Sequence, residues 1–312
     1  MLGRFLQPNA KELIGNLHLD DAICASATDV VEKGYAVIPA TVSPATCRET
    51  IAAFRAFERR HKASFAENRN GFGHYPRIVN MHNVFPELLR LFTRNPVLLA
   101  TLDALFGAPA SIYTTLFYEA GSQQPMHRDT PVFSTRPEYL YFGATVYLEP
   151  ADDGNGCLEV LEGGHLMQEL DRAAMAQKRY GSLDAIPNLD GELWIEYQDK
   201  VVAAGRDHGL TARKLHVNAG DAVIWHPQLP HGGTPIADPT RTRFSLVMHV
   251  TPEGVPVYHQ NVFFNPARAF PKTPAWGYYP YEGRQIADQR FGVSFGHERD
   301  YRMDQFAPVQ AA

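Results

Sequence analysis

Residues 123–132, QQPMHRDTPV, place His127 and Asp129 one residue apart, where a strand-like segment gives way to a loop. An imidazole and a carboxylate at this spacing can form a surface ion pair or cap a turn, or they can supply two ligands of a metal ion. The pattern alone is weak, because the chain contains 13 histidines. The metal hypothesis therefore requires a third ligand from another part of the chain.

The strongest candidate for the third ligand is His231, in the segment GDAVIWHPQLPHGG. Gly232 and Gly233 follow it, so the adjacent backbone is not crowded by side chains and a ligand can come close. If the strand AVIWH lies beside the strand that precedes His127, the three side chains meet at one end of the fold. Two histidines and one carboxylate, with the other positions open, are the ligand set of non-haem Fe(II) oxygenases.

Two other histidines lie near these segments. His226 ends the strand AVIWH, and we expect it to be structural, since Pro227 and Pro230 exclude a helix that would align it with His231. His165, in EGGHLM, is expected to order a turn through its hydrogen bonds, and a place in the lining of the pocket is its alternative role.

Arg243 opens a predicted strand, RFSLVMHVT, twelve residues after His231. Side chains alternate along a strand, so Arg243 shares one face with Ser245 and Val247. An ion pair at the rim is the simpler interpretation. The alternative is a guanidinium that holds a carboxylate inside the fold, where bidentate geometry and a low dielectric strengthen the contact. Arg241 competes for this role but lies nearer the loop, and we favour Arg243.

The elements that must position these residues change character near residue 110. Helical patterns come first, over residues 41–65, 85–93 and 95–107. Ser43 and Asn95 are the expected N-caps, and Gly107 is the expected end of the third helix. Short segments rich in β-branched and aromatic residues follow: SIYTTLFYEA, GATVYLEP, GCLEVLEG, ARKLHVNAG, DAVIWH and RFSLVMHVT. Such strands, separated by turn residues, indicate an antiparallel sandwich or barrel rather than βαβ units.

We expect a single domain over residues 1–312 that is mainly β with flanking helices. Its predicted parts are a helical front (about 1–110), a β core (about 111–252), a lid-like insertion in the core (about 166–205) and a C-terminal extension (253–312). In the extension, WGYYPYEGRQ is aromatic enough to close a pocket or to form a partner interface.

Composition restricts the partners. The net charge is −5 and no run of Lys or Arg stands out, which argues against nucleic acid. No window approaches the ~18–20 apolar residues of a membrane span, and the N-terminal segment lacks a signal-peptide core. Cys24, Cys47 and Cys157 are far apart and are expected to be free thiols in a cytoplasmic protein. We expect a monomer or homodimer with a small-molecule substrate.

Three segments resemble the phytanoyl-CoA dioxygenase family of Fe(II)/2-oxoglutarate-dependent oxygenases. They are MHRD, NGCLEVLEGGH (155–165) and LPHGGTPIADPTRTRFSL, which contains His231 and Arg243. The segments follow one another in the family's order and spacing, and the resemblance spans about residues 110–252. One departure is Gly163–Gly164, where Pro-Gly or Gly-Ser is usual in the family.

The resemblance implies a double-stranded β-helix (jelly-roll) core with helices on one face. It also implies Fe(II), 2-oxoglutarate and O₂ as cofactors, with ascorbate in a supporting role. Arg243 would bind the far carboxylate of 2-oxoglutarate, Thr145 would line the same pocket, and Thr234 would donate to the same carboxylate. The implied reaction is hydroxylation of an unactivated C–H bond with release of succinate and CO₂. Asp129 favours oxidation over halogenation, since related halogenases carry a small residue at that position.

The segments GFGHYPRIVNMHN and DTPVFSTRPEYLYF are expected to contribute to the substrate pocket. The candidates, for which packing between the helices and the barrel is the alternative, are His74, Tyr75, Arg77, Asn80, Phe133 and Arg136, with His165 as above. The same site is also compatible with desaturation, epimerisation or ring formation, and a jelly-roll protein that binds a small molecule without catalysis is a further alternative. An acyl-CoA, an amino acid, a sugar and a secondary metabolite all remain candidate substrates.

Overall fold

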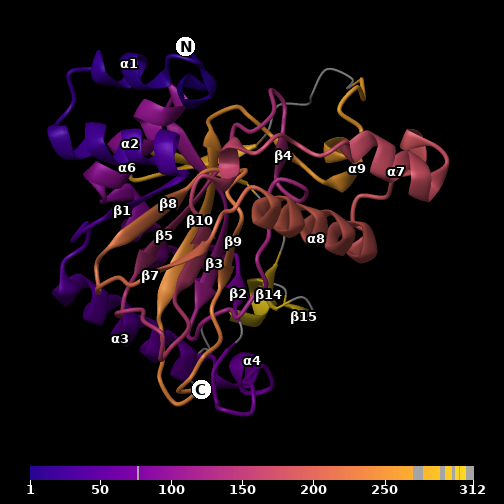
Figure 1. The fold of residues 1–312 in the computed structure, drawn as a ribbon. Coiled ribbons are helices and arrows are strands. Elements are labelled where there is room, and N and C mark those ends of the chain that lie inside the picture. Colours follow the sequence, from indigo (N-terminus) through magenta and orange to yellow (C-terminus); the bar gives the residue numbers. More distant parts are fainter. Residues whose placement is uncertain (76, 270–276, 289–291, 297–298, 302, 307–312) are drawn as a thin grey trace.

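A large antiparallel sheet forms the centre of the computed structural model, which describes residues 1–75, 77–269, 277–288, 292–296, 299–301 and 303–306 (Figure 1). Its main path runs β1-β8-β5-β10-β3-β2-β14-β15, β12 and β13 extend it, and a second sheet has the order β7-β6-β9. The strands are β1 (Tyr35–Ile38), β2 (Ile78–Val79), β3 (Ala110–Tyr118), β4 (Ser134–Thr135), β5 (Phe142–Tyr147), β6 (Leu158–Leu161), β7 (Ala212–Leu215), β8 (Ala222–Trp225), β9 (His231–Gly233), β10 (Ser245–Pro252), β11 (Val257–Tyr258), β12 (Tyr278–Tyr281), β13 (Arg284–Ala287), β14 (Val293–Phe295) and β15 (Arg299–Tyr301).

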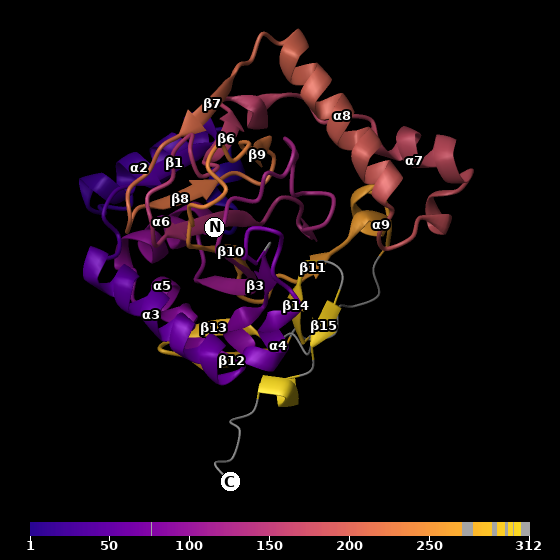
Figure 2. The ribbon, with the colours of Figure 1, turned by 90° about the horizontal axis from the view of Figure 1, so that it is seen from below.

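Helices cover one face of the large sheet, and a second group projects from the other side (Figures 1 and 2). The α-helices are α1 (Ala10–Gly15), α2 (Asp21–Lys33), α3 (Pro44–Arg60), α4 (Lys62–Ala66), α5 (Arg90–Thr93), α6 (Pro96–Phe106), α7 (Arg172–Tyr180), α8 (Gly191–Asp207) and α9 (Gln260–Phe263). The short 3₁₀ helices are η1 (Arg4–Leu6), η2 (Met81–Asn83), η3 (Pro86–Leu89), η4 (Gly164–Leu166), η5 (Leu183–Ala185) and η6 (Met303–Phe306).

The local signals for α3 and α6 are confirmed. The Ser43 side chain accepts a hydrogen bond from the N–H of Thr46, and the Asn95 side chain accepts one from the N–H of Leu98. Gly107 ends α6 in the left-handed conformation, with φ 71°. The pattern over residues 85–93 forms a 3₁₀ turn followed by one short α-helix rather than a single helix.

Alternation along β10 separates the two sides of the large sheet. Leu246 and Met248 point toward the helices and belong to the main apolar core, whereas Ser245, Val247 and His249 face the other way. That inner face packs on the second sheet through an apolar cluster that draws on both: Tyr35, Tyr147, Ala151, Cys157, Val160, Leu215, Val217, Val223, Trp225 and Leu229. Two sheets that pack face to face in this way give the predicted jelly-roll core.

The three candidate ligands meet although their strands are not neighbours in the sheet. The strand AVIWH, which is β8, does not lie beside β3, the strand that precedes His127; β5 and β10 lie between them. The other neighbour of β8 is β1, from the N-terminal part of the chain. The order of strands in a sequence does not fix their order in a jelly roll, because its connections cross between the sheets.

The segment from η4 to α8 folds against α9 rather than into the main core. The apolar cluster they share consists of Met167, Met175, Ala176, Ile186, Leu193, Tyr197, Val201, Phe263 and Phe264. In Figure 2 this unit extends away from the sheets, with one end of α8 close to them. Among the described residues, no helix has the length and apolar character to span a membrane. Trp276, in the aromatic C-terminal segment, lies outside the described residues.

Candidate metal centre

The structure brings His127, Asp129 and His231 together. Nε2 of His127 lies 3.4 Å from Oδ1 of Asp129, and Nε2 of His231 lies 3.5 Å from Oδ2 of the same carboxylate. One ligand atom from each residue lies within 4.8 Å of the others, and all three side chains are buried. Two imidazole nitrogens and one carboxylate oxygen this close together fit a single divalent ion such as Fe(II).

The backbone itself pairs the two histidines. His127 lies in the loop after β3, His231 begins β9, and the two form an isolated antiparallel bridge. The N–H of His127 donates to the carbonyl of His231 at 2.8 Å, and the N–H of His231 donates to the carbonyl of His127 at 2.9 Å. Directly opposite residues in such a pair hold their side chains close together. The two ring centroids are accordingly 4.5 Å apart.

Each imidazole is held so that Nε2 faces the centre. Nδ1 of His127 lies 2.7 Å from the carbonyl of Pro125, and Nδ1 of His231 lies 3.0 Å from the carbonyl of Leu229. A carbonyl oxygen only accepts, so each Nδ1 carries the proton and donates it. Nε2 of each ring then keeps the lone pair that a metal requires.

Asp129 is held by one donor from β8 and one from the residue that precedes β5. The hydroxyl of Tyr141 donates to Oδ2 at 2.8 Å, and the indole N–H of Trp225 donates to the same oxygen at 3.1 Å. Within the described part of the chain, Oδ1 accepts no hydrogen bond and is available to a metal. Tyr141 also bonds Nδ1 of His249, so a chain of buried polar groups stands behind the carboxylate.

The protonation states of the site suit metal binding at neutral pH. Burial opposes ionisation of Asp129, but His231 and His127 outweigh it and hold the pKa of the carboxyl well below its usual range. Burial lowers the pKa of His231 to about 4. The centre therefore offers an ionised carboxylate together with a neutral imidazole from His231.

Unpartnered polar atoms gather on the inner face of the large sheet. Oγ1 of Thr145, Oγ of Ser245 and Nε of Arg243 are buried and make no hydrogen bond with any residue that the structure describes. Ser245 lies in β10 two residues before Val247, which is the register partner of Thr145. An unsatisfied buried polar group costs about 1–3 kcal/mol, so a cluster of them on one face indicates a place for a polar ligand. Two hydroxyls beside a guanidinium fit the far carboxylate of 2-oxoglutarate.

Arg243 and its rival differ in their surroundings. Arg243 is 5% exposed and donates through Nη1 to the carbonyl of Gly156 at 2.8 Å. The guanidinium of Arg241 forks onto the carboxylate of Asp152, at 2.8 and 2.9 Å, near the surface. Thr234 is buried, and its hydroxyl donates to the carbonyl of Cys157 at 3.2 Å. Arg243 therefore has donor capacity left for a ligand, whereas the Arg241 fork is used.

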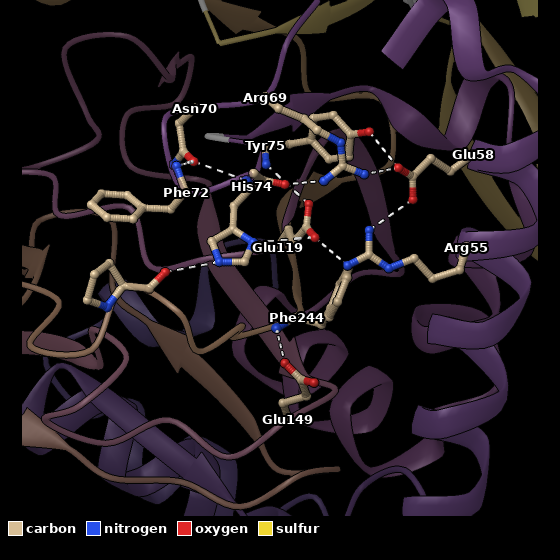
Figure 3. Close-up of polar contacts among 12 residues, drawn as sticks. Arg55, Glu58, Arg69, Asn70, Phe72, His74, Tyr75, Glu119, Glu149 and Phe244 are labelled. Atoms are coloured by element: carbon tan, nitrogen blue, oxygen red, sulfur yellow. Dashed lines mark hydrogen bonds and ion pairs between the residues drawn. The ribbon is translucent and has the colours of Figure 1, made fainter. Parts of the chain in front are cut away.

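Two of the predicted substrate residues lie in a charged network (Figure 3). The hydroxyl of Tyr75 donates to Glu58 at 2.7 Å, and Nδ1 of His74 lies 3.6 Å from Glu119, which also pairs with Arg55. Nε2 of His74 also lies 3.1 Å from the carbonyl of Pro239, and none of these contacts involves a metal residue. Their role in substrate binding stays a prediction.

Arg77 and Asn80 have different surroundings. Asn80 is buried and uses its side-chain carbonyl to accept from Thr114 and from the N–H of Thr115. Arg77 is half-buried, and its guanidinium pairs with none of the described residues. It lies close enough to His249 to add to the effect of burial, which lowers the pKa of that imidazole to about 4. Among the described residues, Arg77 is thus a cation near the centre without an ion-pair partner.

The remaining candidates make defined contacts. Phe133 stacks on His249 with a centroid separation of 4.2 Å. Arg136 donates to the carbonyl of Val262 at 2.9 Å, and Nε2 of His165 bonds the carbonyl of Val31 at 3.0 Å. Phe133 therefore lies behind the metal residues, whereas the hydrogen bonds of the other two tie the backbone together. All three remain predicted substrate contacts.

Sequence reasoning missed several residues around the centre. Tyr141 and Trp225 support Asp129, and Ser245 extends the polar cluster near Arg243. Nε2 of Gln124 lies 3.2 Å from Nε2 of His127, and the ring of Trp194 lies 5.8 Å from the His127 ring. Gln124 lies three residues before His127, within the segment QQPMHRDTPV. The other four residues lie outside that segment, and nothing in their local sequence indicates a role at the centre.

Comparison with solved structures gives the fold. The chain is similar to the non-heme alpha ketoglutarate dependent carbocyclase SnoK from nogalamycin biosynthesis, with a TM-score of 0.57 and 18% identity over 83% of this chain and 94% of that one. It is also similar to the epimerase SnoN from the same biosynthesis (TM-score 0.55, 16% identity, 86% and 99% coverage). A third is EctD from S. alaskensis with 2-oxoglutarate and 5-hydroxyectoine (TM-score 0.55, 14% identity, 75% and 78% coverage).

These likenesses confirm the jelly-roll core. No curated protein matches the chain in sequence. The sequence profile of the phytanoyl-CoA dioxygenase (PhyH) family, however, matches residues 30–242, which is more than half of the chain. As the three segments of the sequence predicted, the chain belongs to the phytanoyl-CoA dioxygenase family of Fe(II)/2-oxoglutarate-dependent oxygenases.

Proposed function

We propose that the protein hydroxylates an unactivated C–H bond of a small-molecule metabolite, with release of succinate and CO₂. The observation that carries this proposal is the convergence of His127, Asp129 and His231 in a buried site of a jelly-roll fold. The unpartnered atoms on the neighbouring inner face support it, since they suit a dicarboxylate co-substrate.

In this proposal His127, Asp129 and His231 hold Fe(II). The iron, bound with 2-oxoglutarate and O₂, supplies the oxidising chemistry, and ascorbate supports activity. The chain contributes positioning: the backbone bridge and the two Nδ1 contacts fix the imidazoles, while Tyr141 and Trp225 fix the carboxylate. Because Asp129 fills the third protein ligand position, the site favours oxidation over halogenation.

The co-substrate lies along the inner face of the large sheet. Arg243 pairs with its far carboxylate, and the hydroxyls of Thr145 and Ser245 donate to the same group. Thr234 is the further predicted donor to this carboxylate, a role in which its hydroxyl turns away from the carbonyl of Cys157, to which it donates at 3.2 Å. The free guanidinium of Arg77 is the strongest of the predicted substrate contacts, because the structure gives it no other partner among the described residues.

Neighbours in fold include an epimerase and a carbocyclase, so epimerisation or ring formation is the second candidate reaction at the same site, and desaturation is also compatible. The third candidate function is a jelly-roll protein that binds a small molecule without catalysis. A substrate screen by mass spectrometry distinguishes the reactions: hydroxylation adds one oxygen, desaturation and ring formation remove two hydrogens, and epimerisation leaves the mass unchanged.

We further propose a single domain over residues 1–312, with the helical front, β core, insertion and extension at the boundaries given above. The three cysteines, Cys24, Cys47 and Cys157, are free, which supports a reducing, cytoplasmic location. The net charge of −5 supports a partner set without nucleic acid. We also propose that the protein is a monomer or a homodimer and that it does not bind membranes.

The test is succinate formation from 2-oxoglutarate under air with Fe(II) and ascorbate, in wild type and in Asp129→Ala. We expect turnover only in the wild type, together with much weaker iron binding by the variant. Equal iron affinity in the two proteins, without succinate from either, would identify a binding module instead of an enzyme. Glu196→Gln, on the exposed side of α8, is the matched control and should retain activity.

A further inference from the structure

A single side chain from α8 holds both peptide groups between two of the metal residues. The N–H of Arg128 donates to Oε1 of Gln198 at 2.8 Å, and Nε2 of Gln198 donates to the carbonyl of Arg128 at 2.9 Å. That N–H belongs to the peptide that joins His127 to Arg128, and that carbonyl belongs to the peptide that joins Arg128 to Asp129. One primary amide thus fixes the two peptide planes on which the ligand side chains depend.

The contact is buried and has no substitute among the described residues. Gln198 is 4% exposed and Arg128 is 1% exposed. In the described backbone, neither the N–H nor the carbonyl of Arg128 has a main-chain partner, whereas the peptide groups of His127 pair with His231. Loss of the Gln198 amide would leave a donor and an acceptor buried without partners, which is unfavourable for both groups. The peptides can escape this penalty only by rotating, and rotation redirects the flanking side chains.

The side chain of Arg128 is tied to the same insertion. Its Nη2 donates to the carbonyl of Gly164 at 2.8 Å, and Nη1 lies 3.6 Å from Glu169. Glu169 in turn accepts from the hydroxyl of Tyr197 at 2.8 Å, the residue before Gln198 in α8. The residue between the two ligands is therefore anchored to the insertion by both its main chain and its side chain.

We propose that Gln198 is a positioning residue of the metal centre, and that α8 belongs to the active site instead of forming a peripheral lid. The inference rests on the proposed function, since it takes His127 and Asp129 as metal ligands. It also explains the place of Trp194, which lies one helical turn before Gln198 and hence on the same face of α8. The anchor that orients the ligand loop also sets this ring beside His127, at 5.8 Å between centroids.

The test uses Co²⁺ as the probe, titrated without oxygen into the metal-free full-length protein and followed by its visible absorption. In Gln198→Leu we expect the Kd for Co²⁺ to rise at least about tenfold, in the range known for residues that orient metal ligands. We also expect an altered Co²⁺ spectrum, since the spectrum reports coordination geometry, and faster hydrogen exchange at the Arg128 amide. Glu196→Gln, two residues away on the same helix, should match wild type in all three measurements.

Gln198→Glu keeps an acceptor for the Arg128 N–H but loses the donor, so it should show a smaller rise in Kd than Gln198→Leu. It also provides the test if the leucine variant does not fold. Faster exchange at Arg128 with a Kd within twofold of wild type and an unchanged spectrum would overturn the positioning role and leave the proposed function intact. Failure of the wild type itself to bind Co²⁺ would overturn the metal centre, and the inference with it.

Discussion

The indole nitrogen of Trp225 reaches Oδ2 of Asp129, at 3.1 Å, across a strand position that has no side chain. That position is Gly143, the register partner of Trp225 in the β5–β8 pair. A Cβ atom built on Gly143 would lie 2.0 Å from Cε2 of the indole. Glycine and tryptophan on adjacent strands therefore form one unit, in which the absence of one side chain makes room for the other.

Gly143→Ala tests this unit. The added methyl group cannot fit without displacing the ring, and overpacking of this kind costs about 1–3 kcal/mol. We expect a lower free energy of unfolding and weaker Co²⁺ binding, because the displaced indole no longer reaches Asp129. Urea denaturation and metal titration measure the two effects. Gly191→Ala, where a Cβ meets no atom within 4 Å, is the control; an equal loss of stability there would contradict the steric argument.

Trp225→Phe separates the hydrogen bond from the packing. A phenyl ring still fills the space over Gly143 but donates nothing to Asp129. We expect the Kd for Co²⁺ to rise about tenfold, the lower end of the range for orienting residues, with a smaller change in the melting temperature than Gly143→Ala causes. Unchanged metal affinity would mean that Tyr141 alone orients the carboxylate.

Arg243→Gln should weaken 2-oxoglutarate binding. A hydrogen bond to a charged group contributes about 1.5–3 kcal/mol, so loss of the guanidinium should raise the Kd about 10- to 100-fold. Calorimetric titration of 2-oxoglutarate into the Co²⁺-loaded protein without oxygen measures it. Arg241→Gln is the matched control, since Arg241 is occupied by Asp152. A larger effect in the control would move the carboxylate site to Arg241.

Stability should fall on acidification through the buried imidazole of His82. Its Nδ1 bonds Oγ1 of Thr115 at 2.7 Å, its Nε2 has no partner in the described part of the chain, and burial lowers its pKa to about 4. The unfolded chain takes up this proton near pH 6.5, whereas the folded protein takes it up only near pH 4. Between these values the unfolded state binds more protons, so the free energy of unfolding falls as pH falls, by about 1.4 kcal/mol per pH unit for this residue.

The measurement is urea denaturation of the metal-free protein at pH 7, 6 and 5. In His82→Gln the free energy of unfolding should depend less steeply on pH, by about the 1.4 kcal/mol per pH unit that one proton contributes. His208→Gln, at an exposed position at the end of α8, should leave the slope unchanged. The same slope in wild type and His82→Gln would show that His82 is protonated in the folded protein.

The parts of the fold that could be predicted from sequence are those with local signals. Caps at Ser43 and Asn95 and the alternation in β10 depend on neighbouring residues, and the structure has them where the sequence placed them. Pairing between strands depends on contacts far along the chain. Hence β1, only four residues long, was not predicted, and the separation of β8 from β3 by β5 and β10 could not be predicted from the sequence.

The candidate site also contains residues that could be predicted from the sequence and residues that could not. H-x-D alone is a weak signal in a chain with 13 histidines, and the ligand triad could be proposed because three segments follow one another in the order of the phytanoyl-CoA dioxygenase family. The residues that orient the triad are tyrosine, tryptophan and glutamine, which occur throughout any globular core. Trp225 bonds Asp129 from 96 positions away, and Gln198 bonds Arg128 from 70 positions away. Only the folded chain brings such pairs together.

In both imidazoles the Nδ1–H donates a hydrogen bond to the main-chain carbonyl two positions earlier, at Pro125 and at Leu229. The tautomer of each ligand is thus set by the backbone path, which the His127–His231 bridge and the Gln198 amide hold in place. Mutations of other side chains around the site can accumulate without rotating either ring. A scaffold of this kind can exchange one substrate for another over evolutionary time while it keeps the same iron chemistry.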